Sequence, residues 1–166
     1  GLFSPSGVFG DATAATRDKG QRLTDGLIEF VLKDIAELRE AIAKYVSRTR
    51  GVAVSPEDVV VGAGAKPFIA YTILSVTDHG AGDEVIYPNP GFPIYESQIR
   101  AMGAVPVPIY LREARGFNFD PAELEAKITA KTRLLILNAP QNPTGGVLDR
   151  ENLDAIAAIL ARHAQG

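Results

Sequence analysis

Short apolar runs alternate along the chain with segments in which apolar residues recur every three or four positions. An apolar run rich in β-branched residues predicts a strand covered on both faces, and the wider spacing predicts an amphipathic helix. Strands are predicted over residues 59–61, 83–87, 105–111 and 133–138. Helices are predicted over residues 34–50, 68–76, 94–102 and 121–128, with a last helix after Asp149.

The ends of these helices carry residues that favour helix boundaries. Asp34 and Glu37 have the spacing of a capping box, and Gly51 is placed to end the same helix. Asp120 followed by Pro121 gives an N-cap and a proline at the first helical position. These signals predict that the first helix starts at Asp34.

The alternation of strands and helices predicts an α/β fold with right-handed crossovers, in which a mainly parallel sheet lies between two helical layers (α/β/α). Residues 1–33 lack this alternation and are interpreted as an N-terminal arm, so that residues 34–166 form the domain. Ligands of such sheets bind beyond the C-terminal ends of the strands. The loops at 62–66, 88–93 and 138–146 are therefore the candidate ligand loops.

Composition and charge exclude several classes of function. A net charge of −3, with Lys and Arg scattered among acidic residues, argues against a nucleic-acid partner. No stretch approaches the roughly 18 to 20 apolar residues of a membrane span, so no membrane partner is expected. The chain has no cysteine, so we predict neither disulfides nor a thiolate metal site, and a reducing cytoplasm fits. No residue is predicted to bind a metal.

The first candidate loop, residues 62–67, joins a predicted strand to a helix whose first turn suits Pro67. Its small residues let the backbone approach a ligand, and free N–H groups at a helix start favour a phosphate. Taken alone, the segment is better explained as a plain glycine-rich turn, because short glycine motifs match often by chance. A dinucleotide fingerprint would need glycine at Pro67, which disfavours a nucleotide binder. Lys66 is interpreted as a solvated or phosphate-facing cation.

The other two loops carry an aromatic ring and a set of amides. Prolines and a glycine in residues 88–93 would project Phe92 from a strand end, where it could stack on a flat ligand or pack in the core. Residues 138–146 place two asparagines and a glutamine directly after an apolar strand. Such amides can hydrogen-bond ligand oxygens without adding charge, although Asn-Pro also forms simple turns.

The string Asn-Ala-Pro-Gln-Asn-Pro-Thr-Gly at 138–145 resembles the Asn-x-Pro-x-Asn-Pro-Thr-Gly signature of class I/II aminotransferases, the fold-type I pyridoxal-phosphate-dependent enzymes. Further segments resemble parts of the same family in the same order: residues 37–42, 64–66, 82–85, 90–95 and 132–133. The resemblance runs from about Asp34 to Ala164. It implies that residues 34–166 are part of the large, cofactor-binding domain of that fold.

The resemblance also implies a cofactor, pyridoxal 5'-phosphate, and roles for five residues. The backbone N–H groups of Gly64, Ala65 and Lys66 would hold its phosphate, Phe92 would stack on its ring, and Asn142 would bond its phenolic oxygen. The implied activity is transfer of an amino group from an amino acid to a 2-oxo acid. The implied full-length protein is a cytoplasmic homodimer that acts in amino-acid metabolism.

In this family the lysine that holds the cofactor covalently follows later in the chain, as do the acid at the ring nitrogen and the substrate-binding arginine. We therefore expect these groups beyond residue 166, no catalytic residue within residues 1–166, and no activity from this N-terminal part alone. Lyases and synthases of the same fold remain alternatives, as does the aminotransferase-like effector domain of a transcription regulator. Asp34 and Ala36 depart from the glycine and proline common at those family positions, and Leu23 from a tyrosine.

Overall fold

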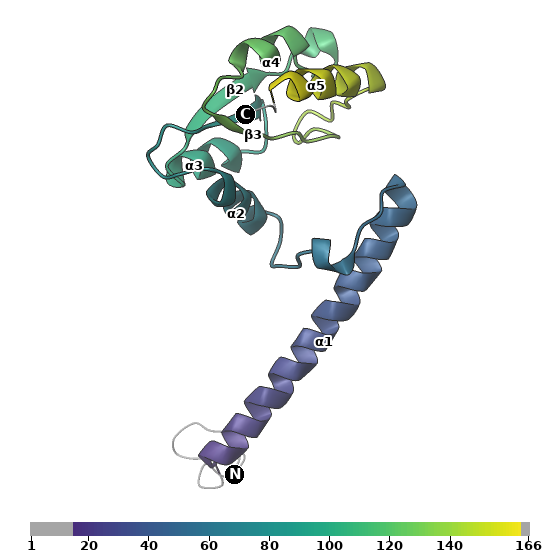
Figure 1. Cartoon of the computed structure of the whole chain (residues 1–166), viewed down its shortest axis with the longest axis vertical. Helices are drawn as coiled ribbons and strands as arrows, with labels where there is room; N and C mark the ends of the chain where they lie inside the picture. The colour runs from purple at the N-terminus through teal and green to yellow at the C-terminus, as the bar shows by residue number, and fades with distance from the viewer. Residues whose placement is uncertain (1–14, 164–166) are drawn as a thin grey trace. The chain divides into compact units, whose positions relative to one another are not determined.

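The structure, a computed structural model, describes residues 15–163 and consists of two compact units, Gly1–Val61 and Gly62–Gly166. Residues 1–14 of the predicted arm lie outside the described residues. The elements in chain order (Figure 1) are α1 (Arg17–Arg50), a 3-10 turn (Pro56–Asp58), α2 (Lys66–Val76), β1 (Glu84–Asn89), α3 (Ile94–Ala101), β2 (Val105–Tyr110), a 3-10 turn (Glu113–Arg115), α4 (Pro121–Lys127), β3 (Thr132–Leu135) and α5 (Arg150–His163). Within residues 15–163, no helix has both the length and the apolar content that crossing a bilayer requires.

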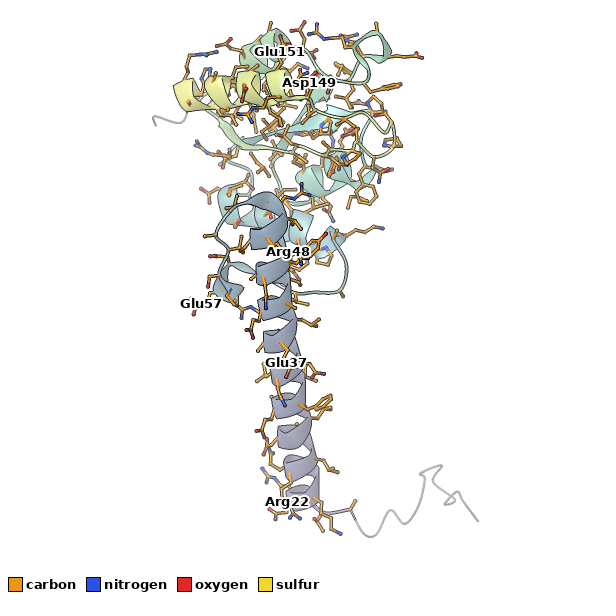
Figure 2. The ribbon with its side chains drawn as sticks, turned by 90° about the vertical axis from the view of Figure 1, so that its right-hand side faces the viewer. Arg22, Glu37, Arg48, Glu57, Asp149 and Glu151 are labelled. Carbon is orange, nitrogen blue, oxygen red and sulfur yellow. The ribbon has the colours of Figure 1, made fainter. Side chains whose placement is uncertain are left out.

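The first helix begins at Arg17, so the expected start at Asp34 was wrong. The Thr16 side chain caps α1 by accepting a hydrogen bond from the Lys19 N–H at 3.2 Å. No glycine or proline lies between Gly26 and Gly51, and the polar residues before position 34 continue the helix with their side chains in solvent (Figure 2). The capping-box spacing at Asp34 therefore falls inside a continuous helix, where the backbone N–H groups already have partners.

The end of the helix is as expected. Gly51 adopts the left-handed conformation, with φ at 68°, and its N–H donates to the Ser47 carbonyl at 3.1 Å. A short segment then returns along the last turns of α1, where Arg39 Nε donates to the Pro56 carbonyl at 2.7 Å. The division of the chain into an arm over 1–33 and a large domain over 34–166 stays a prediction.

The predicted strand at Val59–Val61 is not a strand in the structure. Its backbone is extended at Val59, with φ −105° and ψ 124°, but no described residue pairs with the segment. Val60 is 74% exposed. A β-branched run raises the preference for an extended backbone, whereas a strand also needs a neighbour to accept and donate its hydrogen bonds.

The second unit contains a three-stranded parallel sheet with the order β2-β1-β3. Val85 in the central strand β1 lies opposite Pro106 of β2 on one side and Leu134 of β3 on the other. The predicted strands at 83–87, 105–111 and 133–138 correspond to β1, β2 and β3. The mainly parallel α/β sheet is therefore confirmed, with three described strands in place of four.

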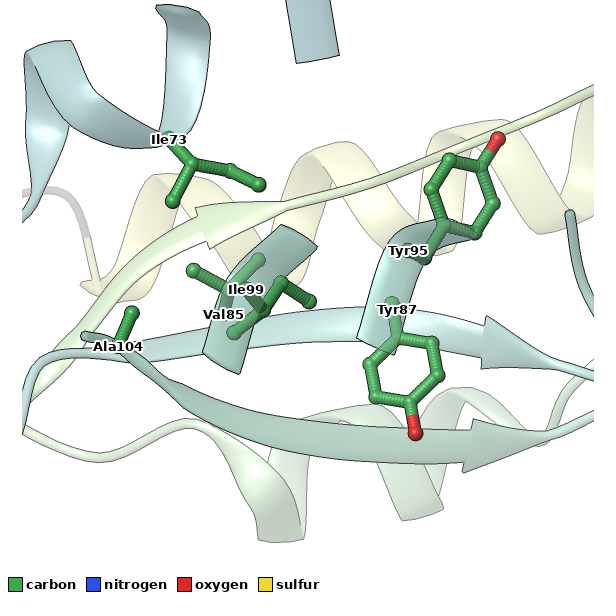
Figure 3. Packing of buried hydrophobic residues seen from close by; sticks show 6 residues of the cluster. All are labelled: Ile73, Val85, Tyr87, Tyr95, Ile99 and Ala104. Atoms are coloured by element: carbon green, nitrogen blue, oxygen red, sulfur yellow. The ribbon is translucent and has the colours of Figure 1, made fainter. Parts of the chain in front are cut away.

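Helices cover both faces of this sheet, as the alternation of side chains along β1 shows. Val85 and Tyr87 point to one face, where they pack with Ile73 of α2 and Ile99 of α3 (Figure 3). The intervening Ile86 points to the other face. There it belongs to a second cluster, with residues Ile109, Phe119, Leu124, Ile156 and Ile159 from β2, α4, α5 and the segment before α4. The α/β/α layering predicted from sequence is thus present.

Candidate functional site

The loops after β1 and β3 leave the same edge of the sheet, because the two strands are parallel neighbours. The loop before α2 is joined to α3, which follows the second loop: Gln98 Nε2 of α3 donates to the Lys66 carbonyl at 3.3 Å. A mostly apolar pocket of about 410 Å³ lies beside the start of α2, between α2, α3 and the segment around β3. It is lined by Ala65, Phe68, Ile69, Thr72, Tyr95 and residues 134–137.

The first loop offers two free backbone donors at the start of α2. The N–H groups of Ala65 and Lys66 have no hydrogen-bond partner among residues 15–163. The N–H of Gly64, in contrast, donates to the Gly62 carbonyl at 2.9 Å. Gly64 has a φ of 83°, which suits glycine, although a Cβ there would meet open space. Gly64 therefore shapes the turn, while Ala65 and Lys66 present the donors.

The second loop holds Phe92 against the core without burying it completely. Its ring packs edge-on against Tyr95, with 5.9 Å between the ring centroids and 81° between the planes. Phe92 is partly buried and lies against the cluster that contains Ile73 and Val85. The position of Phe92 is thus compatible both with packing in the core and with stacking on a ligand. A half-buried ring packs on one side and leaves surface exposed on the other.

A glycine makes the turn before Phe92 possible. A Cβ at Gly91 would lie 2.1 Å from the Pro88 carbonyl oxygen, far inside van der Waals contact. The carbonyl of Phe92 in turn accepts a hydrogen bond from the Tyr95 N–H at 3.1 Å, at the start of α3. The backbone of this loop is consequently fixed on both sides of the aromatic ring.

The third loop exposes one amide and buries another. The Asn142 side chain is exposed and has no hydrogen-bond partner among the residues that the structure describes. Gln141, by contrast, is only 6% exposed, and its Nε2 donates to the Pro90 carbonyl of the second loop at 3.0 Å. The chain thus leaves Asn142 free to bind a ligand and uses its neighbour to join two loops.

A second contact between the loops involves Tyr95 and Asn138. The Asn138 side-chain amide lies near the Tyr95 hydroxyl. Burial raises the pKa of Tyr95, and the nearby Asn138 amide acts in the opposite direction. Tyr95 therefore stays protonated at neutral pH, and its ring packs on Phe92 and lines the pocket.

Tyr87 and Glu96 provide the charged part of this region. Tyr87 Oη donates to Glu96 Oε2 at 2.9 Å, and the Arg100 guanidinium donates to Glu96 Oε1 at 2.9 Å. Burial, reinforced by the Glu96 carboxylate, raises the pKa of Tyr87 to about 12. The hydrogen bonds from Arg100 and Tyr87 lower the pKa of Glu96. At neutral pH the pair is a neutral phenol and an ionised carboxylate.

The structure brings the predicted site residues to connected segments, but it does so through residues to which the sequence assigned no role. Gln98 reaches the first loop, and Gln141 joins the second to the third. Tyr95 packs on Phe92 and lies near Asn138. The position of Tyr95, one helical turn after Phe92, was a usable local signal. The contact of Gln141 spans 51 residues, so no local pattern could reveal it.

Comparison with known proteins identifies the family of this chain. The family described as aminotransferase class I and II matches residues 10–165. A probable aspartate/prephenate aminotransferase of Aquifex aeolicus is 39% identical over 123 residues, which cover 74% of this chain and 31% of that protein. An aspartate aminotransferase of Pyrococcus horikoshii is 41% identical over 125 residues, which cover 75% of this chain and 32% of that protein.

Solved structures give the same result. The aspartate aminotransferase of Thermus thermophilus with maleate superposes with a TM-score of 0.72 at 36% identity, over 77% of this chain and 33% of that one. An alanine aminotransferase from Pyrococcus furiosus superposes with a TM-score of 0.73 at 30% identity, over 78% of this chain and 32% of that one. The chain thus spans about a third of the length of the relatives it matches. By sequence and by fold, this chain belongs to the aminotransferase class I and II family.

Proposed function

We propose that the full-length protein is a pyridoxal-phosphate-dependent aminotransferase, which moves an amino group from an amino acid to a 2-oxo acid. The observation that carries the proposal is the free amide of Asn142 within the family signature, on a loop that Gln141 ties to the Phe92 loop. Family membership supports the reaction class. In this proposal Ala65, Lys66, Phe92 and Asn142 supply part of the cofactor site.

The start of α2 fits a phosphate. The N–H groups of Ala65 and Lys66 lack partners within residues 15–163, and the helix behind them adds a partial positive charge. The exposed Lys66 ammonium adds a full positive charge next to them. We assign these two N–H groups as phosphate donors and Gly64 as the residue that gives the turn its conformation.

Phe92 and Asn142 fit the ring of the cofactor. Phe92 presents a flat apolar surface whose position is fixed by Tyr95, which suits stacking on a pyridine ring. Asn142 offers an uncharged N–H donor, which suits a hydrogen bond to a phenolate oxygen and would stabilise its negative charge. When bound, pyridoxal phosphate supplies an electron sink for the negative charge that develops at the substrate Cα.

A homodimer and a cytoplasmic location complete the proposal for the full-length protein. Both follow from the family resemblance, and the lack of cysteine agrees with a reducing compartment. Light scattering of the purified full-length protein tests whether it is a homodimer. A mass of one chain at micromolar concentration would contradict it.

The proposed activity is tested on the full-length protein with pyridoxal phosphate. We expect an absorbance band near ~420 nm, typical of this cofactor bound to its lysine. We also expect amino transfer from aspartate, the substrate in several relatives' names, to a 2-oxo acid. Asn142→Ala should weaken cofactor binding, while Gln21→Ala, which alters an exposed amide on α1, should not.

Three results would overturn the proposal in different ways. Elimination or condensation products without amino transfer would identify a lyase or synthase of the same fold. Cofactor binding without turnover of any amino acid would favour a binding domain such as a regulator's effector domain. If the full-length protein did not give the ~420 nm band of the lysine-bound cofactor when mixed with pyridoxal phosphate, the proposed cofactor would be refuted.

A further inference from the structure

Gln141 stands out among the buried polar residues of the described chain, which also include Thr77 and Asp83. Thr77 ends α2 by bonding the Ile73 carbonyl, and Asp83 forms an ion pair with Arg133. Gln141 serves neither a helix end nor an ion pair. Burying an amide costs free energy unless its donors and acceptors find partners, so its contacts indicate its role.

Both contacts of the Gln141 side chain are made by its amide nitrogen, to backbone carbonyls. Nε2 donates to the Pro90 carbonyl at 3.0 Å and to the Asn142 carbonyl at 3.1 Å. A side chain that must give two hydrogen bonds to two neutral acceptors has to be an amide or a cation. A glutamate of the same shape would instead turn a carboxylate oxygen toward two carbonyl oxygens.

The main chain of Gln141 closes the loop that carries Asn142. Its N–H donates to the Gly146 carbonyl at 2.7 Å, and its carbonyl accepts from the Gly145 N–H at 2.6 Å. One residue therefore fixes the turn over residues 141–146, the carbonyl of Asn142 and the contact with the second loop. The Asn142 side chain, which has no partner of its own among the described residues, depends on this turn for its position.

The contact with Pro90 acts on Phe92 through a short and constrained segment. Only Gly91 lies between them, and a Cβ at that position would overlap the Pro88 carbonyl. Tyr95 fixes the other side of the Phe92 ring. A shift of Pro90 would therefore be transmitted to Phe92, because the segment has little freedom to absorb it.

We propose that Gln141 is a positioning residue that locks the Asn142 loop to the Phe92 loop, so that the amide and the aromatic ring face one cofactor ring together. This inference rests on the proposed function for the identity of the cofactor. The locking of the two loops is a property of the chain by itself. Gln141 makes no contact with cofactor or substrate in this role.

The test uses the full-length protein with the variants Gln141→Met and Gln141→Glu. Met keeps the length of the side chain and removes both donors, and Glu keeps its shape. Thr77→Val is the matched control, since it removes a buried side-chain hydrogen bond of 2.8 Å at the end of α2. Thermal unfolding gives the Tm of each of the three variants, so that their stabilities can be compared.

Hydrogen exchange of the cofactor-free protein measures the locking. In Gln141→Met we expect faster exchange both at Gly145, whose N–H is bonded within the turn, and across residues 91–95. Thr77→Val should leave both regions unchanged. Titration with pyridoxal phosphate should then show affinity roughly tenfold or more weaker in both Gln141 variants, the size expected for losing buried hydrogen bonds. The visible circular dichroism of the bound cofactor should change as well.

The inference is overturned if Gln141→Met exchanges like wild type in the second loop. It is also overturned if Gln141→Met binds the cofactor no more weakly than a Thr77→Val protein of equal stability, or if it fails to fold, since Gln141 would then be a structural residue. Failure of the proposed function gives a different result: the wild-type protein would not bind pyridoxal phosphate, while the exchange data would still report on the locking.

Discussion

Tyr87, in the central strand, donates its hydroxyl hydrogen to the Glu96 carboxylate at 2.9 Å, on the helix that follows the Phe92 loop. Arg100 holds the other oxygen of the same carboxylate at 2.9 Å. This contact joins the strand before the loop to the helix after it. The loop is therefore closed at its base by a hydrogen bond that requires a protonated phenol.

The Tyr87 contact predicts a loss of stability in alkali. The pKa of Tyr87 is raised from 10.0 to about 12, so its contribution is fully present below pH 10 and is lost as the pH rises through about 12. Tyr87→Phe should have a lower Tm than wild type at neutral pH, and the difference should shrink over that window. Tyr71→Phe, which alters an exposed tyrosine, is the control. A constant difference from pH 7 to about 12 would contradict the prediction.

Gly91 predicts that a single methyl group disturbs the second loop. In Gly91→Ala the new Cβ would meet the Pro88 carbonyl oxygen at 2.1 Å, so the backbone must move, at a cost of about 1–3 kcal/mol. Gly20→Ala lies in α1 with no atom within 4 Å and should stabilise that helix by about 0.5–1 kcal/mol. Chemical denaturation measures the change in the free energy of unfolding for each variant. Equal changes in the two variants would refute the steric argument.

The continuity of α1 predicts a strong effect of proline at an exposed position. Ala36 is exposed, so Ala36→Pro removes no packing, yet it deletes a helical hydrogen bond and should destabilise the helix by about 3 kcal/mol. Hydrogen exchange should accelerate in the turns that precede residue 36. Ala36→Gln keeps a good helix former at the same site and should leave the exchange unchanged. Unaltered exchange in Ala36→Pro would mean that α1 is not continuous there.

The cap of α5 predicts a loss of stability in acid. The N–H and side chain of Asn152 donate to Asp149, at 2.8 and 2.7 Å, and these hydrogen bonds lower the pKa of Asp149. A lowered pKa means that the cap is at full strength above the ordinary value of 3.8 and weakens as the pH falls below it. Asp149→Ala should therefore lower the Tm at neutral pH, and the difference from wild type should narrow in acid.

Asp149→Asn keeps a side chain that can cap the helix but removes its negative charge. Asparagine is also a good N-cap, so this variant should keep most of the neutral-pH stability and lose the dependence on acid. Thermal unfolding of the three proteins as a function of pH measures both effects. A pH dependence that persists in Asp149→Asn would assign it to another group.

The fold of the second unit could be predicted to a large extent, because its signals are local. Val85 and Ile86 lie in a short apolar run typical of a covered strand, and Asp120 with Pro121 marks a helix start that the structure retains. The candidate ligand loops followed from the strand ends, since parallel strands deliver their loops to one edge. The family signature at 138–145 further indicated which loops are candidates for cofactor binding.

Tertiary structure decided what depends on residues far apart in the chain. Val59–Val61 has the composition of a strand, but pairing needs a neighbour that no local pattern supplies. Asp34 carries a capping signal, yet the helix passes through it. The Gln141 amide meets the Pro90 carbonyl across 51 residues. The sequence by itself therefore determined the helices and strands of the second unit, its candidate loops and its family, because propensity, periodicity and capping act over a few residues. Only the tertiary structure decided which donors stay free and which side chains join the loops, because a hydrogen bond exists only once folding brings its two partners together.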